Sequence, residues 1–167
     1  MTVWVLDRVT KNWALGTLTP GIREPLLGEV LQLNLLFNPG AAFSLGTGIT
    51  PVFAFVQFAV SLLVVLAAFR VGSTAWAVAL GLVLGGASGN LFDRLTRPPG
   101  FARGHVVDFL ELPNWPVFNV ADSAICCAAV LVAITAFAGI GFDGTREGGD
   151  ERSATDPAPR PDSGSSS

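Results

Sequence analysis

The sequence is poor in charged and polar aromatic side chains. Only 14% of its 167 residues are charged, tyrosine is absent, and the single lysine and single histidine are Lys11 and His105. A soluble domain usually has about 25% charged residues, whereas half of this chain is hydrophobic. The composition therefore excludes both a disordered chain and an ordinary soluble domain, and it indicates a membrane protein.

The sequence also lacks an excess of positive charge. Seven basic and seven acidic groups balance over residues 1–142, and the net charge of −3 comes from residues 143–167. No nucleic-acid partner is therefore expected, because such partners need a basic surface. Residues 143–167 are rich in Gly, Pro, Ser and mixed charge, which predicts a disordered tail.

Cysteine chemistry and cofactor motifs are missing as well. Cys126 and Cys127 are adjacent within an apolar run, so they form neither a disulfide framework nor a metal-ligand spacing. The sequence contains no zinc motif, P-loop or dinucleotide fingerprint. We therefore expect neither a metal nor a cofactor.

What the sequence has instead is three long runs without any charge. They cover residues 49–69, 71–92 and 123–142. Each run is long enough to cross about 30 Å of hydrocarbon as a helix. The short connection near residues 70–74 predicts that the first two runs form an antiparallel hairpin. Glycines four residues apart (Gly81, Gly85 and Gly89) predict close approach of a neighbouring helix.

The remaining segments have other patterns. Residues 2–17 would form a helix of only about 24 Å, interrupted by Asp7, Arg8 and Lys11, so we expect a first span that has lost its beginning. Residues 28–48 show a short alternation of leucine and polar residues, which predicts a strand pair or an amphipathic loop at the interface. Prolines exclude one long helix over residues 95–116.

Four carboxylates near span ends are candidates for chemistry, because ionisable groups at membrane depth are costly. Asp7 is four residues before Lys11, and Asp93 is next to Arg94, so both look like ion pairs that fix helix ends.

Asp108 and Asp122 have no lysine or arginine within four positions. Two such carboxylates close together would share a proton and supply a general base with a general acid. The alternatives are two capping aspartates at unrelated loops, or a proton relay in a small proton- or ion-coupled transporter subunit.

Five short motifs occur in order along the chain. They are LDRVTK at 6–11, FNPGAAFS at 37–44, GNLFDR at 89–94, VVDF at 106–109 and FNVADS at 118–123. In this set the chain resembles the lipoprotein signal peptidases (signal peptidase II), a family of bacterial membrane aspartic proteases.

The resemblance and the uncharged runs together predict an all-α membrane protein. Its peptidase domain, residues 1–142, would hold four transmembrane helices, the first of them truncated, at about 2–17, 51–70, 74–94 and 118–142. The resemblance implies an extracytoplasmic β-cradle at 22–48, an extracytoplasmic loop at 95–117 and a cytoplasmic location for the tail at 143–167. It places the protein in the bacterial cytoplasmic (inner) membrane, among membrane lipids, with its active site on the extracytoplasmic side.

The resemblance also implies the reaction. An aspartic endopeptidase would cleave a prolipoprotein signal peptide at its lipobox, just before a cysteine that already carries diacylglycerol. Asp108 and Asp122 would be the catalytic residues. The residues that would bind substrate or support the site are Asn38, Asn90, Arg94, Asn119, Asp7, Lys11 and Asp93.

Overall fold

The computed structural model describes residues 1–40 and 49–146. The end of the FNPGAAFS motif and most of the expected tail therefore lie outside the described residues. The elements are α1 (Thr2–Thr17), β1 (Arg23–Leu27), β2 (Leu31–Asn38), α2 (Thr50–Ala68), α3 (Thr74–Thr96), β3 (Val106–Glu111) and α4 (Val120–Phe137).

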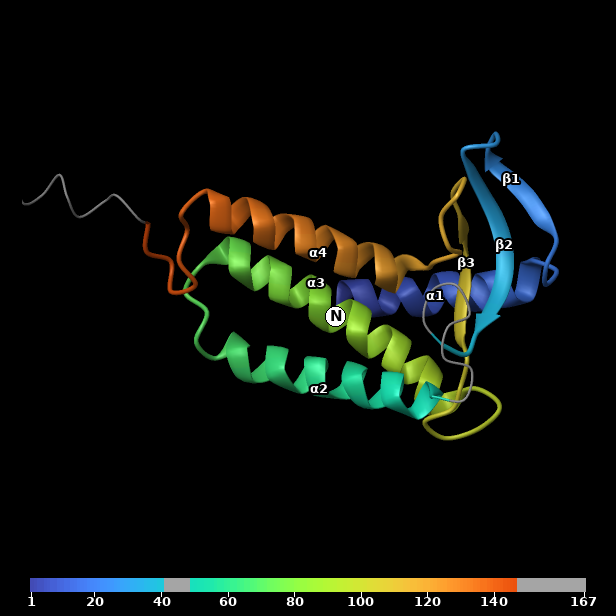
Figure 1. Cartoon of the computed structure of the whole chain (residues 1–167), viewed down its shortest axis with the longest axis horizontal. Helices are drawn as coiled ribbons and strands as arrows, with labels where there is room; N and C mark the ends of the chain where they lie inside the picture. The colour runs from blue at the N-terminus through green and yellow to red at the C-terminus, as the bar shows by residue number, and fades with distance from the viewer. Residues whose placement is uncertain (41–48, 147–167) are drawn as a thin grey trace, which may run out of the picture.

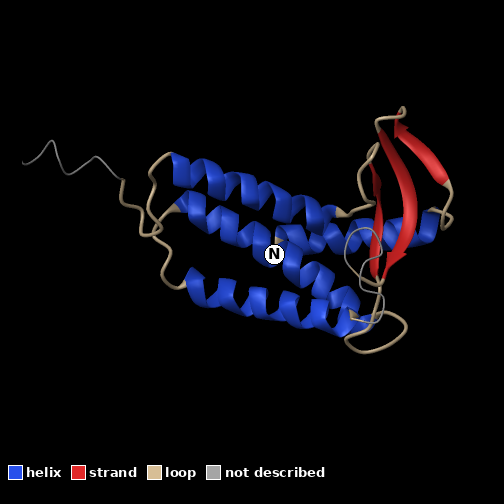
Figure 2. Ribbon diagram, in the orientation of Figure 1, coloured by secondary structure: helices blue, strands red, loops and turns tan. Residues whose placement is uncertain are grey.

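The helices form a bundle with the sheet across one end (Figure 1). Helices α2, α3 and α4 lie side by side, while α1 starts about halfway along α3 and runs to the sheet (Figure 1). Figure 2 separates the helical part from the β part. In the described residues, α2, α3 and α4 are long and apolar enough to cross a membrane, with mean hydropathies of 2.3, 1.5 and 2.2. The expected fold class, a helical membrane protein with a small sheet, is confirmed in this outline.

The helix ends follow from local sequence. Pro51 lies in the first turn of α2, where its missing N–H costs nothing. Helix α3 ends at Thr96, just before Pro98 and Pro99, which cannot continue it. Helix α4 begins with a capping box between Asn119 and Asp122, so the side chain of Asp122 is fixed at the sheet end of the bundle.

The sheet has the order β1-β2-β3 and is antiparallel throughout. Strand β2 lies within residues 28–48, where a strand pair or an amphipathic loop was expected, but its partner β1 precedes that range, and β3 was not expected. Its sequence, VVDFLE, is short and nearly continuously apolar, and such a strand gives no alternating pattern. The sheet packs on the end of α1 through a core of Ala14, Leu18, Leu33, Leu35, Val107 and Phe109. Two of these core residues flank Asp108 and hold it in place.

Small residues let the helices approach closely along α3. A side chain at Gly85 would collide with Val3 of α1, and one at Gly89 would collide with Asp7. The expectation for Gly81 was wrong, because nothing lies within 4 Å of the position its Cβ would take. The close contact continues instead at Gly86, where a Cβ would lie 2.5 Å from the carbonyl oxygen of Ala121.

Gly86→Ala is expected to destabilise the fold, because the added methyl pushes α4 away from α3. An overpacked core position of this kind costs about 1–3 kcal/mol, and thermal unfolding in detergent would measure the loss. Gly81→Ala is the matched control on the same helix. Its methyl meets open space, so it should leave stability unchanged or raise it by up to about 1 kcal/mol. Equal stabilities of the two variants would contradict the packing argument.

Candidate active site

Asp108 lies in the middle of β3 and is 1% exposed. Its two carboxylate oxygens accept hydrogen bonds from different amides. Asn38 Nδ2 donates to Oδ2 at 2.9 Å, and Asn119 Nδ2 donates to Oδ1 at 2.6 Å. The backbone N–H of Gly40 donates to Asn38 Oδ1 at 3.0 Å, which turns the NH₂ group of Asn38 toward Asp108. The carboxylate is therefore held from two elements of the fold.

Asp122 lies in the first turn of α4 and is held from both sides. Its Oδ2 accepts the backbone N–H of Asn119 at 3.2 Å, and its own N–H donates to Asn119 Oδ1 at 3.0 Å. The other oxygen, Oδ1, accepts Asn90 Nδ2 at 2.8 Å. Asp122 is thus a helix-capping residue, and Asn90 of α3 fixes the orientation of its second oxygen.

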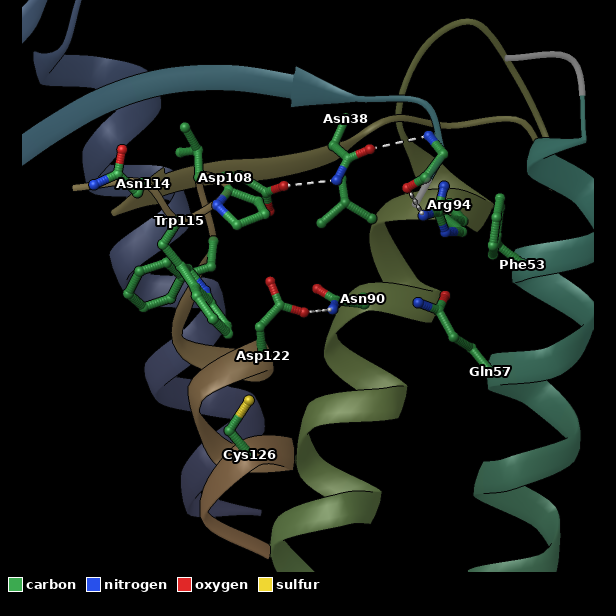
Figure 3. A pocket seen from close by; sticks show the side chains of 15 residues that line it. Asn38, Phe53, Gln57, Asn90, Arg94, Asp108, Asn114, Trp115, Asp122 and Cys126 are labelled. Atoms are coloured by element: carbon green, nitrogen blue, oxygen red, sulfur yellow. Dashed lines mark hydrogen bonds between the residues drawn. The ribbon is translucent and has the colours of Figure 1, made fainter. Parts of the chain in front are cut away.

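Both carboxylates line one cavity of about 570 Å³. Figure 3 shows Asp108 and Asp122 on one side of the view, with Phe53 and Gln57 of α2 on the other. The interpretation of these residues as caps at unrelated loops is therefore wrong, although Asp122 does cap its helix. The Asn119 amide lies against both aspartates, so β3 and α4 present them together.

Burial and the nearby charge of Asp122 raise the pKa of Asp108 to about 7. Hydrogen bonds from Asn38 and Asn119 oppose this effect without cancelling it. At neutral pH the pair can therefore hold one proton between two carboxylates, which is the condition for general acid–base chemistry.

Behind the cavity, Lys11 is fully buried and has three acceptors. Its Nζ lies 2.8 Å from Asp7 Oδ2, 3.0 Å from Asp93 Oδ2 and 2.8 Å from Asn90 Oδ1. The expected pair of Asp7 with Lys11 is confirmed. Because Lys11 donates to Asn90 Oδ1, the Asn90 NH₂ group must face Asp122.

The expected pairing of Asp93 with Arg94 was wrong. Asp93 instead accepts from Arg8, Lys11 and Arg97. Consecutive residues on a helix point about 100° apart, so neighbours in sequence do not face each other.

Arg94 points to a different side of α3 from Asp93. Its guanidinium donates to the carbonyl oxygens of Pro39 and Gly40, at 3.4 and 3.2 Å, and lies over the Phe53 ring. Arg94 thus fixes the chain that follows Asn38 against the cavity.

Residues 1–138 match the model of the family described as signal peptidase (SPase) II. The chain belongs to the signal peptidase II family. A lipoprotein signal peptidase of Rhodococcus jostii is 47% identical over 146 residues, which are 87% of this chain and 74% of the relative. One of Leifsonia xyli is 45% identical over 148 residues, 88% of this chain and 68% of the relative.

Solved structures agree with this assignment. A bacterial membrane enzyme solved at 2.3 Å aligns with a TM-score of 0.73 and 26% identity, over 81% of this chain and 83% of that one. As a member of the signal peptidase II family, the protein is a protease. The transporter alternative has no support from these relatives.

The structure brings together every residue expected at the site. Asn38, Asn90, Arg94, Asp108 and Asp122 line the cavity, Asn119 joins the two aspartates, and Asp7, Lys11 and Asp93 lie behind Asn90. Phe53, Gln57 and the segment 114–118 also line the cavity, although the sequence-based expectations do not include them. A lone glutamine within an uncharged run is a signal for Gln57, whereas Phe53 gives no such signal.

Proposed function

We propose that this signal peptidase II removes signal peptides from prolipoproteins by cleaving before a diacylglyceryl-modified cysteine, with Asp108 and Asp122 as the catalytic pair. The observation that carries the proposal is that two buried carboxylates from different elements line one cavity, each held by asparagine amides.

The reaction needs an activated water and a polarised carbonyl group. The pKa of Asp108 is raised to about 7, so the pair can hold one proton at neutral pH, and we assign that proton to Asp108 and the role of general base to Asp122. Asp122 takes a proton from the water while the water oxygen bonds to the scissile carbonyl carbon. At the same time Asp108 donates its proton to the carbonyl oxygen. Asp122 then gives its proton to the leaving amine as the C–N bond breaks, and Asp108 takes a hydroxyl proton of the intermediate as the carbonyl group re-forms. The pair therefore ends with one proton, on Asp108, as it began.

The other polar residues have supporting roles in this proposal. Asn90 and Asn119 keep the two carboxylates in register, and Asn38 with Arg94 shapes the wall of the cavity next to Asp108. Asp7, Lys11 and Asp93 position Asn90 from behind.

In the membrane, all four helices would act as spans within a peptidase domain of residues 1–142. The sheet and both aspartates lie at the same end of the bundle, where α3 ends and α4 begins (Figure 1). This placement supports an active site at the extracytoplasmic surface of the bacterial cytoplasmic membrane. The apolar signal helix of the substrate would then lie in the lipid, with its lipobox beside the cavity. The C-terminal tail of the enzyme, residues 143–167, would lie in the cytoplasm.

The test is to incubate the purified protein with a diacylglyceryl-modified prolipoprotein and, in parallel, with the same prolipoprotein without the lipid. Mass spectrometry should find a mature product that starts at the lipidated cysteine, and no product from the unmodified chain. Cleavage at another bond, or no cleavage of the lipidated chain, would contradict the proposal.

Cleavage is expected to decline as the pH rises through about 7. The pKa of Asp108 is raised to about 7, so the one-proton form of the pair is present below that pH and is lost above it. Profiles of kcat/KM from pH 5 to 9 would measure this, with a substrate that has no titratable side chain next to the scissile bond. A rate constant that climbs steadily from pH 6 to 9 would refute the assignment of the proton to Asp108.

A further inference from the structure

A second cavity, of about 370 Å³, lies at the far end of the sheet from Asn38. Its polar lining residues are Arg23 of β1, Glu29 and Gln32 around the β1–β2 turn and start of β2, Glu111 at the end of β3, and Asn114. Apart from Asn114, none of these residues lines the cavity that holds Asp108 and Asp122, and the mechanism proposed above does not use them.

The two cavities are neighbours, because Asn114 lines both. Asn114 has a φ of 58°, a left-handed conformation that asparagine adopts more readily than most residues. The turn after β3 therefore forms the boundary between the cavities, and a chain leaving the first cavity past Asn114 enters the second.

The substrate must extend in two directions from the scissile bond. Its apolar signal helix belongs beside the helices, so the polar chain after the cleaved cysteine must leave on the side of the sheet. Strand β3 gives the scale of this path. Glu111 is three residues after Asp108, which is about 10 Å at about 3.3 Å per residue. Because side chains alternate across a strand, the substrate would pass the turn at Asn114, which lines both cavities, to reach Glu111, at least about three residues beyond the scissile bond.

Two polar residues of the second cavity, Arg23 and Glu111, are paired with each other. Glu111 accepts from Arg23 Nε at 2.9 Å and Nη2 at 2.6 Å, and from Asn34 Nδ2 at 2.8 Å. The hydrogen bond from Arg23 lowers the pKa of Glu111 below its ordinary value, so this carboxylate is ionised at neutral pH. Because Arg23 balances Glu111, the additional carboxylate of Glu29 leaves the lining with a formal charge of −1.

We infer that this second cavity is a subsite for the polar peptide that follows the lipidated cysteine. The subsite favours neutral or basic residues over acidic ones about three to five positions beyond the scissile bond. The inference rests on the proposed function and adds a determinant of substrate choice to it. The active-site cavity selects the bond to be cut, whereas this subsite discriminates among substrates that differ in the residues after the lipidated cysteine.

The experiment uses lipidated substrates that share one signal peptide and differ only after the cysteine. One ends one residue after the cysteine. The others carry six residues after it, with Ser, Lys or Glu at the third to fifth positions from the scissile bond, where the cysteine is the first. The wild-type protein should cleave the Lys substrate with a kcat/KM about fivefold above that of the Glu substrate, the size expected for a partly exposed charge pair. The short substrate cannot reach the subsite.

Glu29→Lys changes the formal charge of the lining from −1 to +1, so the preference should reverse in favour of the Glu substrate. Glu24→Lys is the matched control, because Glu24 is an exposed carboxylate on the same hairpin but does not line the cavity. That control should keep the wild-type order, and neither variant should change kcat/KM for the short substrate.

The possible outcomes separate the two proposals. Equal cleavage of all six-residue substrates by the wild type, or the same shift in both variants, would overturn the subsite and leave the proposed function standing. Failure of the wild type to cleave any lipidated substrate would overturn the proposed function, and the subsite with it.

Discussion

Asparagine in place of Asp108 or Asp122 is expected to lower kcat for cleavage of a lipidated prolipoprotein by at least about 10³-fold, in the range of a lost general acid or base. Asparagine has nearly the same volume and can occupy the same cavity, but its amide neither accepts a proton from water nor donates one to the leaving group. Both variants should be equally inactive, since the two carboxylates act as one unit.

The control for this experiment is Glu24→Gln, which neutralises an exposed carboxylate of β1 and should cleave at the wild-type rate. Thermal unfolding in detergent should show that Asp108→Asn and Asp122→Asn remain folded, since each amide oxygen keeps one of the two hydrogen bonds that the carboxylate accepts and the loss of the other costs about 1–3 kcal/mol. Full activity of either aspartate variant would rule out the proposed catalytic pair.

The largest loss of stability is expected for Lys11→Met. Lys11 is the only residue that forms an ion pair with Asp7 within the described part of the chain, and both side chains are fully buried. Removing one partner of a buried pair costs about 3–5 kcal/mol, because the remaining charge stays in a low-dielectric environment. Chemical or thermal unfolding in detergent would measure the loss.

The double variant Lys11→Met with Asp7→Asn separates charge from packing. It removes the Asp7 carboxylate that Lys11→Met leaves buried without its ion-pair partner, so it should recover a large part of the stability that the single variant loses. Asp93 keeps Arg8 and Arg97 as partners in both variants. A double variant as unstable as Lys11→Met alone would mean that the loss comes from packing of the lysine stem.

Features of the fold and site that depend on local sequence could be predicted. The uncharged runs mark the three apolar helices, and the four-residue spacing of Asp7 and Lys11 predicts their ion pair. The absence of nearby cations singles out Asp108 and Asp122.

Features that depend on tertiary contacts could not be predicted in this way. Asp93 meets Arg8 only because α1 packs on α3, and no spacing within either helix contains that information. Strand β3 was missed because a buried six-residue strand lacks alternation. Phe53 reaches the cavity through helix packing alone. The three-residue spacing places Asn119 beside Asp122, but no spacing places Asn38 or Asn90 near the aspartates, although the resemblance to a family does name them.

The single amide of Asn119 fastens three separate elements to one another. Its oxygen accepts from the first turn of α4, and its NH₂ group reaches both Asp108 on β3 and Asn90 on α3. Within the described residues, Asn38 is the one residue of the β1–β2 hairpin whose side chain donates a hydrogen bond to either carboxylate. Strand β2 also pairs with β3, with Leu36 opposite Asp108, so the hairpin and the strand of Asp108 belong to one sheet. The Asn119 amide is therefore the joint that couples this sheet to the two helices that hold Asp122 and Asn90.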